Sequence, residues 1–226
     1  MVNELPELRN RIGVFRDRRH AGEVLARMLR GKVPAEARIL AIPAGGVPVA
    51  AAMADALGLP LDVAVVSKVT PPWNSEAGYG AVAFDGRVRI DAWARAGLGV
   101  GEREARAGVE RTTARVRHRV EILRTGAGPL VAAGGTAVLV DDGLASGLTM
   151  ALAAEAVRGA GAGRIVVAVP TGPERTVRKL ASAVEELHCA NVRTGRSFAV
   201  ADAYQAWSDV AEEELLALLA PHRERA

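Results

Sequence analysis

The stretch that most constrains this chain is residues 136–150, TAVLVDDGLASGLTM. Residues 136–140 are an apolar run of the kind found in buried strands, and two adjacent carboxylates, Asp141 and Asp142, follow it directly. Residues 143–147, most of which are small, then suit a loop, and a helix can begin directly after them. This order of strand, acid pair, loop and helix predicts a ligand site at the carboxyl end of a strand in a parallel sheet.

The loop after the acid pair, residues 143–149 (the signature loop), has the composition of an anion site. Backbone N–H groups converge on a phosphate only where no bulky side chain intervenes, and residues such as Gly143 and Gly147 keep that space clear. Ser146 and Thr149 add hydroxyl donors, and the helix start adds unpaired amides and a positive dipole end. A plain strand-to-helix turn would need neither the acids nor the hydroxyls, so the pattern predicts a bound sugar phosphate.

These residues resemble the signature of the type I phosphoribosyltransferase family, in which an apolar strand, two acids and two apolar or small residues precede Ala/Thr–Thr/Ser–Gly–x–Thr. That family moves ribose 5-phosphate from phosphoribosyl pyrophosphate to a nitrogen of a base. The resemblance implies that Asp141 and Asp142 are catalytic and hold the ribose hydroxyls, directly or through Mg²⁺. It also implies a set of 5-phosphate-binding residues: Ala145, Ser146, Gly147, Leu148 and Thr149.

A second turn follows the short strand expected at residues 38–42. Gly45 and Gly46 lie between that strand and an Ala-rich helix, and together they form another anion-type turn. The resemblance assigns Ala44, Gly45 and Gly46 to pyrophosphate binding. The family often has Arg or Lys before the glycine pair, so Ala44 removes a cation from this site. The resemblance also implies a cis peptide bond between Pro43 and Ala44.

A buried strand is expected at residues 62–67, followed by Lys68 and a loop too rich in proline and glycine for a helix. Residues 81–90 predict a hairpin that turns at Asp85 and Gly86. The family carries a mobile lid at this point. The resemblance implies that Lys68 reaches the pyrophosphate and that Glu76 carries a proton, whereas the alternative is that both are solvated loop residues.

Residues 102–124 predict a long helix with one apolar face and an arginine-rich remainder. No aromatic residues interleave these arginines, which favours a solvated helix with internal ion pairs over a nucleic-acid surface. Later in the chain, a strand expected at 164–169 leads into a turn at 170–173. Thr171 and Gly172 in this turn are candidates for contact with the acceptor.

Strands alternate with helices along the chain, which predicts an α/β fold with a mainly parallel twisted sheet flanked by helices, as in type I phosphoribosyltransferases. We expect one phosphoribosyltransferase-like domain over residues 1–226. Its core would span about 36–182 and include a lid hairpin, and a small hood would come from about 1–34 and 183–226.

A wider resemblance links the chain to a poorly characterised phosphoribosyltransferase-like group. Its members begin with a Phe-Arg-Asp-Arg helix, here Phe15 to Arg18, and end with a segment that matches Phe198, Val200 and Tyr204. This resemblance spans nearly the whole chain, but it assigns no acceptor. At position 145 this chain has Ala, as the adenine enzymes do, whereas the hypoxanthine-guanine enzymes carry an acid there. The resemblance therefore disfavours a 6-oxopurine as the acceptor.

Composition sets wider limits. The net charge is +3 and the pI is about 9.5, a mild imbalance that suits phosphorylated ligands. A single cysteine, Cys189, excludes an internal disulfide and fits a reducing cytoplasm. The first residues contain no apolar signal region, and the longest uncharged run is too short to cross a bilayer. We therefore expect a cytoplasmic protein.

The predicted function is a Mg²⁺-dependent phosphoribosyltransferase of nucleotide metabolism that releases pyrophosphate. Its partners would be phosphoribosyl pyrophosphate and a small nitrogenous base, with a homodimer as an option and with neither nucleic acid nor membrane. The alternative is a regulator that senses phosphoribosyl pyrophosphate and binds nucleic acid without catalysis, which the arginine-rich helix and Ala44 favour. The sequence lacks the Gly-x-Gly-x-x-Gly turn after a first strand that a dinucleotide-binding oxidoreductase would need.

Overall fold

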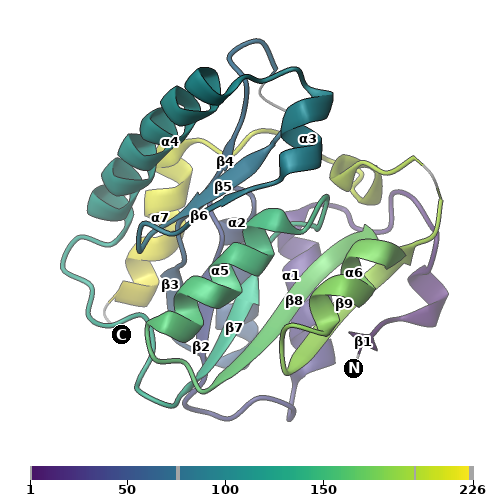
Figure 1. The fold of residues 1–226 in the computed structure, drawn as a ribbon. Helices are drawn as coiled ribbons and strands as arrows, with labels where there is room; N and C mark the ends of the chain where they lie inside the picture. Colours follow the sequence, from purple (N-terminus) through teal and green to yellow (C-terminus); the bar gives the residue numbers. More distant parts are fainter. Residues whose placement is uncertain (1, 75–76, 196, 224–226) are drawn as a thin grey trace.

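A six-stranded parallel sheet lies at the centre of the chain, in the order β1-β9-β8-β7-β2-β3 (Figure 1). The structure is a computed structural model that describes residues 2–74, 77–195 and 197–223. The strands are β1 (Val2–Asn3), β2 (Arg38–Ala41), β3 (Leu61–Val63), β7 (Thr136–Val140), β8 (Arg164–Pro173) and β9 (Glu186–Arg193). The predicted fold class is confirmed, and β2 and β7 lie side by side with Ala41 opposite Val140.

Helices cover both faces of this sheet (Figure 1). They are α1 (Arg18–Leu29), α2 (Gly46–Leu57), α5 (Leu148–Gly159), α6 (Glu174–Ala181) and α7 (Glu212–Arg223). Side chains of β7 alternate between two cores, since Val138 packs with α1 and α2 while Leu139 packs with α5 and α6. The Asp17 side chain caps α1 by accepting from the His20 amide at 2.7 Å.

A second, antiparallel sheet of order β4-β5-β6 packs between α5 and α4 (Glu102–Leu123). Its strands are β4 (Val66–Val69), β5 (Gly80–Ala83) and β6 (Val88–Ile90), and α3 (Ala92–Gly97) follows them. The hairpin prediction is confirmed. The single strand predicted at 62–67 is wrong, because β3 and β4 belong to different sheets, and an unbroken apolar run does not reveal where a chain changes sheet. Lys68 therefore lies in a strand.

The turn predicted at 170–173 is also wrong, because β8 continues to Pro173. Thr171 and Gly172 pair with Asn191 and Val192 of β9. The register passes over Pro170, which has no N–H to donate, and resumes at the next residue. A proline pair suggested a turn, but the pairing along β9 keeps the segment extended.

Several elements within the ranges 1–34 and 183–226, which were predicted to form a hood, belong to the main fold. β1 and β9 extend the central sheet, and α7 packs against α2 and β3, because their apolar faces complete the main core. We call residues 198–207 the hood segment; it includes the 3-10 helix η2 (Val200–Ala203). Residues of this segment line a cavity at the carboxyl ends of β2 and β7. An isolated bridge pairs Phe15 with Tyr204 and fixes this segment to the start of α1.

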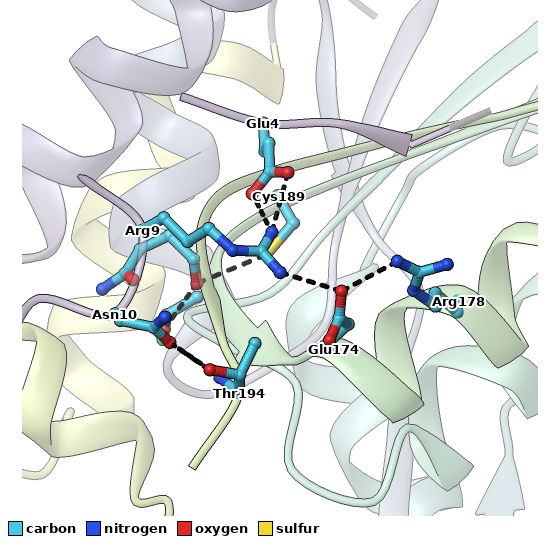
Figure 2. Close-up of polar contacts among 9 residues, drawn as sticks. Glu4, Arg9, Asn10, Glu174, Arg178, Cys189 and Thr194 are labelled. Carbon is cyan, nitrogen blue, oxygen red and sulfur yellow. Dashed lines mark hydrogen bonds and ion pairs between the residues drawn. The ribbon is translucent and has the colours of Figure 1, made fainter. Parts of the chain in front are cut away.

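The N-terminal segment is held to the sheet by the polar contacts in Figure 2. Arg9, which follows the 3-10 helix η1 (Pro6–Leu8), bonds to Glu4 at 2.7 Å and to Glu174 at 2.8 Å. Asn10 accepts from the Thr194 amide at 2.8 Å, just beyond β9. These contacts fix the path of the chain toward α1. No helix in the described ranges combines the length and apolarity needed to cross a membrane.

The contact between α1 and α2 depends on Gly22. A Cβ added there would lie 2.3 Å from the Val49 carbonyl oxygen and 2.8 Å from the Ala52 Cβ. Gly22→Ala should therefore lower the free energy of unfolding by about 1–3 kcal/mol, because overpacking outweighs the better helix propensity of alanine. Denaturant unfolding measures this difference.

Gly97→Ala is the matched control, since Gly97 ends α3 and a Cβ there meets no atom within 4 Å. We expect it to change stability by less than about 0.5 kcal/mol. Equal effects of the two substitutions would contradict the packing argument.

Candidate active site

A cavity of about 680 Å³ opens where the carboxyl ends of β2 and β7 meet. Most of the predicted site residues line it: Ala44, Gly45, Lys68, Asp141, Asp142, Ala145, Ser146, Gly147 and Thr149. Residues without a predicted site role line it too, among them Ser67 of β4, Arg115 and Arg119 of α4, and Trp207 of the hood segment. Segments that are distant in the sequence thus share one cavity.

The acid pair and the glycine turn are in direct contact. A Cβ on Gly45 would lie 1.8 Å from an Asp142 carboxylate oxygen, and one on Gly46 would lie 2.7 Å from the Val140 carbonyl oxygen. Only residues without a side chain allow these two loops to approach so closely. Gly46 itself lies beneath Asp141 and does not line the cavity.

Asp142 is held by groups from both ends of the chain. Arg18, at the start of α1, donates from Nε and Nη2 to the same Asp142 oxygen, each at 2.9 Å, with the two side chains 11% and 15% exposed. The Tyr204 hydroxyl donates to the Asp142 backbone oxygen at 2.7 Å. Burial, and then the Asp142 charge, raises the pKa of Tyr204 well above its usual value, so this hydroxyl keeps its proton.

Arg18 is itself fixed by further contacts. Its guanidinium carbon lies 3.9 Å from the ring centroid of Trp207, a cation–π arrangement, and Nη1 donates to the Ser208 backbone oxygen at 2.7 Å. The hood segment, α1 and the acid pair therefore form one connected unit.

Asp141 has a different environment. Its Oδ1 accepts from the Asp142 amide at 2.9 Å, and the side chain is half-buried at the cavity floor. Burial, and then the neighbouring Asp142 carboxylate, raises the pKa of Asp141 well above its usual value, while the Lys68 charge acts in the opposite direction. The site accumulates negative charge that a cation would relieve.

The signature loop offers donors to a ligand. Within the described ranges, the amides of Ala145, Ser146 and Gly147 have no protein acceptor. Gly147 has φ of 74°, which a residue with a side chain rarely adopts, and the Thr176 hydroxyl fixes the loop by donating to the Ala145 carbonyl at 3.0 Å. Leu148 begins α5 and does not line the cavity.

The second turn matches its expected backbone, since the peptide bond between Pro43 and Ala44 is cis. Ala44 supplies no charge here. Lys68 lines the same cavity from β4. Glu76 lies outside the described residues, so its predicted role as a proton carrier stays a prediction.

The structure does not bring Thr171 and Gly172 to the cavity. Thr171 is fully buried, and its hydroxyl donates to the Asn191 carbonyl at 3.1 Å. A Cβ on Gly172 would lie 3.1 Å from both Leu144 and Val177. Both residues pack beneath the signature loop, where the Thr171 carbonyl accepts from the Leu144 amide at 2.8 Å.

Sequence reasoning assigned no site role to Arg18, Arg115, Arg119, Tyr204 or Trp207. The Phe15 to Arg18 motif was the available signal for Arg18, and the Phe198 to Tyr204 motif was the signal for Tyr204. These motifs marked both ends of the chain but did not show that the two ends meet. Nothing in the helical pattern of α4 showed which arginines face the cavity.

Comparison with known proteins gives the family. The model of the phosphoribosyl transferase domain matches residues 22–202. A Mycobacterium tuberculosis protein with the provisional name phosphoribosyl transferase is 35% identical over 207 residues, which cover 91% of this chain and 46% of that protein. The chain thus spans about half the length of the curated relatives that it matches.

A solved structure supports the same relationship over almost the whole chain. The crystal structure of a protein from Thermus thermophilus has a TM-score of 0.69 and 33% identity, covering 92% of this chain and 98% of that one. The family match includes both the acid pair and the signature loop, which the fold brings together at one cavity. On this basis the chain belongs to the phosphoribosyl transferase family.

Proposed function

We propose that this chain transfers ribose 5-phosphate from phosphoribosyl pyrophosphate to a small nitrogenous base and releases pyrophosphate. The observation that carries the proposal is the contact of the acid pair with the Gly45 turn beside a signature loop whose amides are free within the described ranges. Together these features provide separate places for a sugar, a phosphate and a leaving group in one cavity.

The substrate would lie along the cavity in a defined direction. Its 5-phosphate would accept from the signature loop, its ribose hydroxyls would donate to Asp141 and Asp142, and its pyrophosphate would extend toward Ala44 and Gly45. The acceptor base would then approach from the hood segment, where Phe198 and Trp207 line the wall. This assigns the acceptor to the hood segment in place of Thr171 and Gly172.

The acid pair suits Mg²⁺ as the cofactor. Mg²⁺ is usually bound by one or two carboxylates together with substrate oxygens, and Asp141 and Asp142 offer hard oxygen ligands at the point where negative charge accumulates. No group of three or more His, Cys, Asp or Glu side chains in the described part of the chain could hold a metal ion by itself. Such a metal would neutralise the pyrophosphate and orient it.

The reaction would break the bond between the anomeric carbon and the pyrophosphate oxygen and form a bond to a base nitrogen. Pyrophosphate leaves with the bonding electrons, and the base nitrogen gives up its proton to a carrier, for which Glu76 stays the sequence-based candidate. The carboxylates beside the ribose would stabilise positive charge that develops on the sugar. Exclusion of water would prevent hydrolysis of the activated sugar.

The alternative function, a nucleic-acid-binding sensor, has less support. Two of the α4 arginines that suggested it, Arg115 and Arg119, line the ligand cavity. A cytoplasmic location and a homodimer remain expectations that rest on the sequence and the family resemblance.

Purified protein with phosphoribosyl pyrophosphate and Mg²⁺, screened for pyrophosphate release over a panel of free bases, tests the proposal. Release that depends on one base supports the transferase. Calorimetric binding of phosphoribosyl pyrophosphate without release for any base would favour the sensor.

Asp142→Asn tests the role of the acid pair in turnover. It removes the charge beside the ribose but keeps an oxygen that can accept from Arg18, so we expect the fold to persist and transfer to fall by at least about a hundredfold. Steady-state pyrophosphate release measures the effect. Asp209→Asn, at an exposed position outside the cavity, is the matched control and should leave the rate unchanged. Full activity in Asp142→Asn would contradict the assignment.

Asp141→Asn tests whether the negative charge of Asp141 lowers the stability of the folded protein. Because the folded-state pKa of Asp141 is raised, the wild type loses stability as the pH rises through that range, and the uncharged amide avoids this loss. We expect Asp141→Asn to increase the free energy of unfolding at neutral pH relative to the wild type. The gain should shrink as the pH falls toward about 4, where the wild-type carboxyl becomes protonated also when unfolded. A gain independent of pH in denaturant titrations would argue against this origin.

Sulfate provides a direct test of the signature loop. A crystal soaked in sulfate should show the anion within about 3 Å of the Ala145, Ser146 and Gly147 amides, since these donors have no acceptor among the described residues. Sulfate found elsewhere in the cavity, with this loop vacant, would count against a 5-phosphate site.

A further inference from the structure

The strand β6 forms a free edge of the second sheet, whose order is β4-β5-β6. The Arg87 carbonyl accepts from β5 at 2.9 Å, and the Asp91 amide donates to the residue before β5 at 2.8 Å. Because the bonded positions alternate along an antiparallel strand, the N–H and C=O groups of Val88 and Ile90 point away from β5. Among the described residues these groups have no hydrogen-bond partner.

The space beside this edge is open. A cavity of about 610 Å³ lies between β6 and the helices α5 and α6, and Arg89, Ile90 and Asp91 form the strand side of its wall. An uncovered edge with unpaired backbone groups is a surface on which a further strand can pair. Within the described ranges, the chain supplies no such strand.

The two faces of β6 differ in chemistry. Arg87 and Arg89 lie on the face toward α5, where Arg89 forms an ion pair with Glu155. Side chains alternate along a strand, so Val88 and Ile90 lie on the opposite face. Both are apolar, and they are 44% and 37% exposed. Natural edge strands usually avoid exposed apolar side chains unless another chain covers them.

The strand β6 and the residues that flank it are complementary to themselves in an antiparallel pair centred on Arg89. Val88 then lies opposite Ile90 of a second copy, and the outward N–H and C=O groups of these residues bond to one another. Their side chains meet on the apolar face. On the other face, Arg87 lies opposite Asp91 of the second copy, so opposite charges face each other twice across the pair. Apolar contact, backbone hydrogen bonds and charge therefore favour the same partner.

Other registers of this pair are less favourable. A register centred on Val88 would place Arg87 opposite Arg89 of the second copy, and like charges in this position are destabilising. A register centred on Ile90 would run into α3, where the chain is no longer extended. In the favoured register Arg89 meets its own equivalent, but each Arg89 is compensated by Glu155 of its own chain.

We propose that β6 is an interaction surface that pairs with β6 of a second copy of this chain, so that two three-stranded sheets form one antiparallel sheet of six strands. α3 follows β6 directly, and the register brings Trp93 of this helix, which is 90% exposed, to the level of the Asp85 and Gly86 turn of the second copy. Covering Trp93 adds apolar area to the interface. None of these residues lines the active-site cavity, so the proposal does not depend on the transferase activity.

Disulfide trapping tests the pairing and its register. Arg89→Cys places a thiol on the two-fold axis, where facing Cα atoms in such a pair lie about 4.5 Å apart, within reach of a disulfide. We expect mild oxidation to convert at least about half of this variant into a covalent dimer on a non-reducing gel. Arg87→Cys is the matched control, because this residue lies about 13 Å from its own equivalent and should not crosslink. The native Cys189 is buried and should not contribute.

Sedimentation velocity measures the association without an introduced thiol. The wild type should show a concentration-dependent equilibrium between monomer and dimer. Ile90→Lys removes an apolar contact and brings a charge to the edge, so the dissociation constant of the dimer should rise at least about tenfold. Ile12→Lys is the matched control and should leave this constant unchanged, since Ile12 is 71% exposed but belongs to the N-terminal segment rather than to the second sheet.

A wild type that remains monomeric at about 100 μM would overturn the proposal. It would also be overturned if Arg89→Cys crosslinks no more readily than Arg87→Cys, because the contact would then lack the expected register. The same holds if Ile90→Lys weakens the dimer no more than Ile12→Lys does. Crosslinking confined to Arg89→Cys, together with a weaker dimer only in Ile90→Lys, would support the pairing of the two edges.

Discussion

The close approach of two loops at neighbouring strand ends is the constraint on which the site depends. β2 and β7 are adjacent and in register, so the chain that leaves each strand enters the same space. The Gly45 turn and the Asp142 carboxylate occupy that space together only because no side chain projects from the glycine. The sheet provides the adjacency and the glycine provides the room. The acid pair consequently lies between the signature loop and the second turn, where a sugar can connect two phosphate groups.

The hood segment is connected to the acid pair through contacts with Asp142. Arg18 and Tyr204 come from opposite ends of the chain, and both bond to the same aspartate, one at the carboxylate and one at the backbone oxygen. A residue that would contact substrate is therefore also the point that connects the hood segment to the sheet. Within the described ranges no arginine forms an ion pair with Asp141, so the two carboxylates differ: Asp142 is compensated by Arg18, while burial and the neighbouring Asp142 raise the pKa of Asp141.

Local signals in the sequence were sufficient to predict the elements that build the site. They were not sufficient to predict contacts between residues that are distant in the sequence. The apolar run before Asp141, the Asp85 and Gly86 turn and the cis bond before Ala44 each depend on a few adjacent residues or a family motif, and the structure agrees with them. The ion pair of Arg18 with Asp142 joins residues 124 positions apart, and no local pattern encodes it. The extension of β8 past Pro170 likewise depends on β9, a distant partner. Helical periodicity identified the buried face of α4 but not what its other faces meet.

The distribution of charge around the cavity follows from the same geometry. Ala44 precedes Gly45, the residue whose added Cβ would lie 1.8 Å from an Asp142 oxygen, and it brings no charge to this turn. Among the described residues, Arg18 is the side chain that forms an ion pair with Asp142. Lys68, Arg115 and Arg119, which also line the cavity, come from β4 and α4, whereas the acid pair follows β7. The cations and the carboxylates of this one cavity therefore belong to separate elements that only the fold brings together.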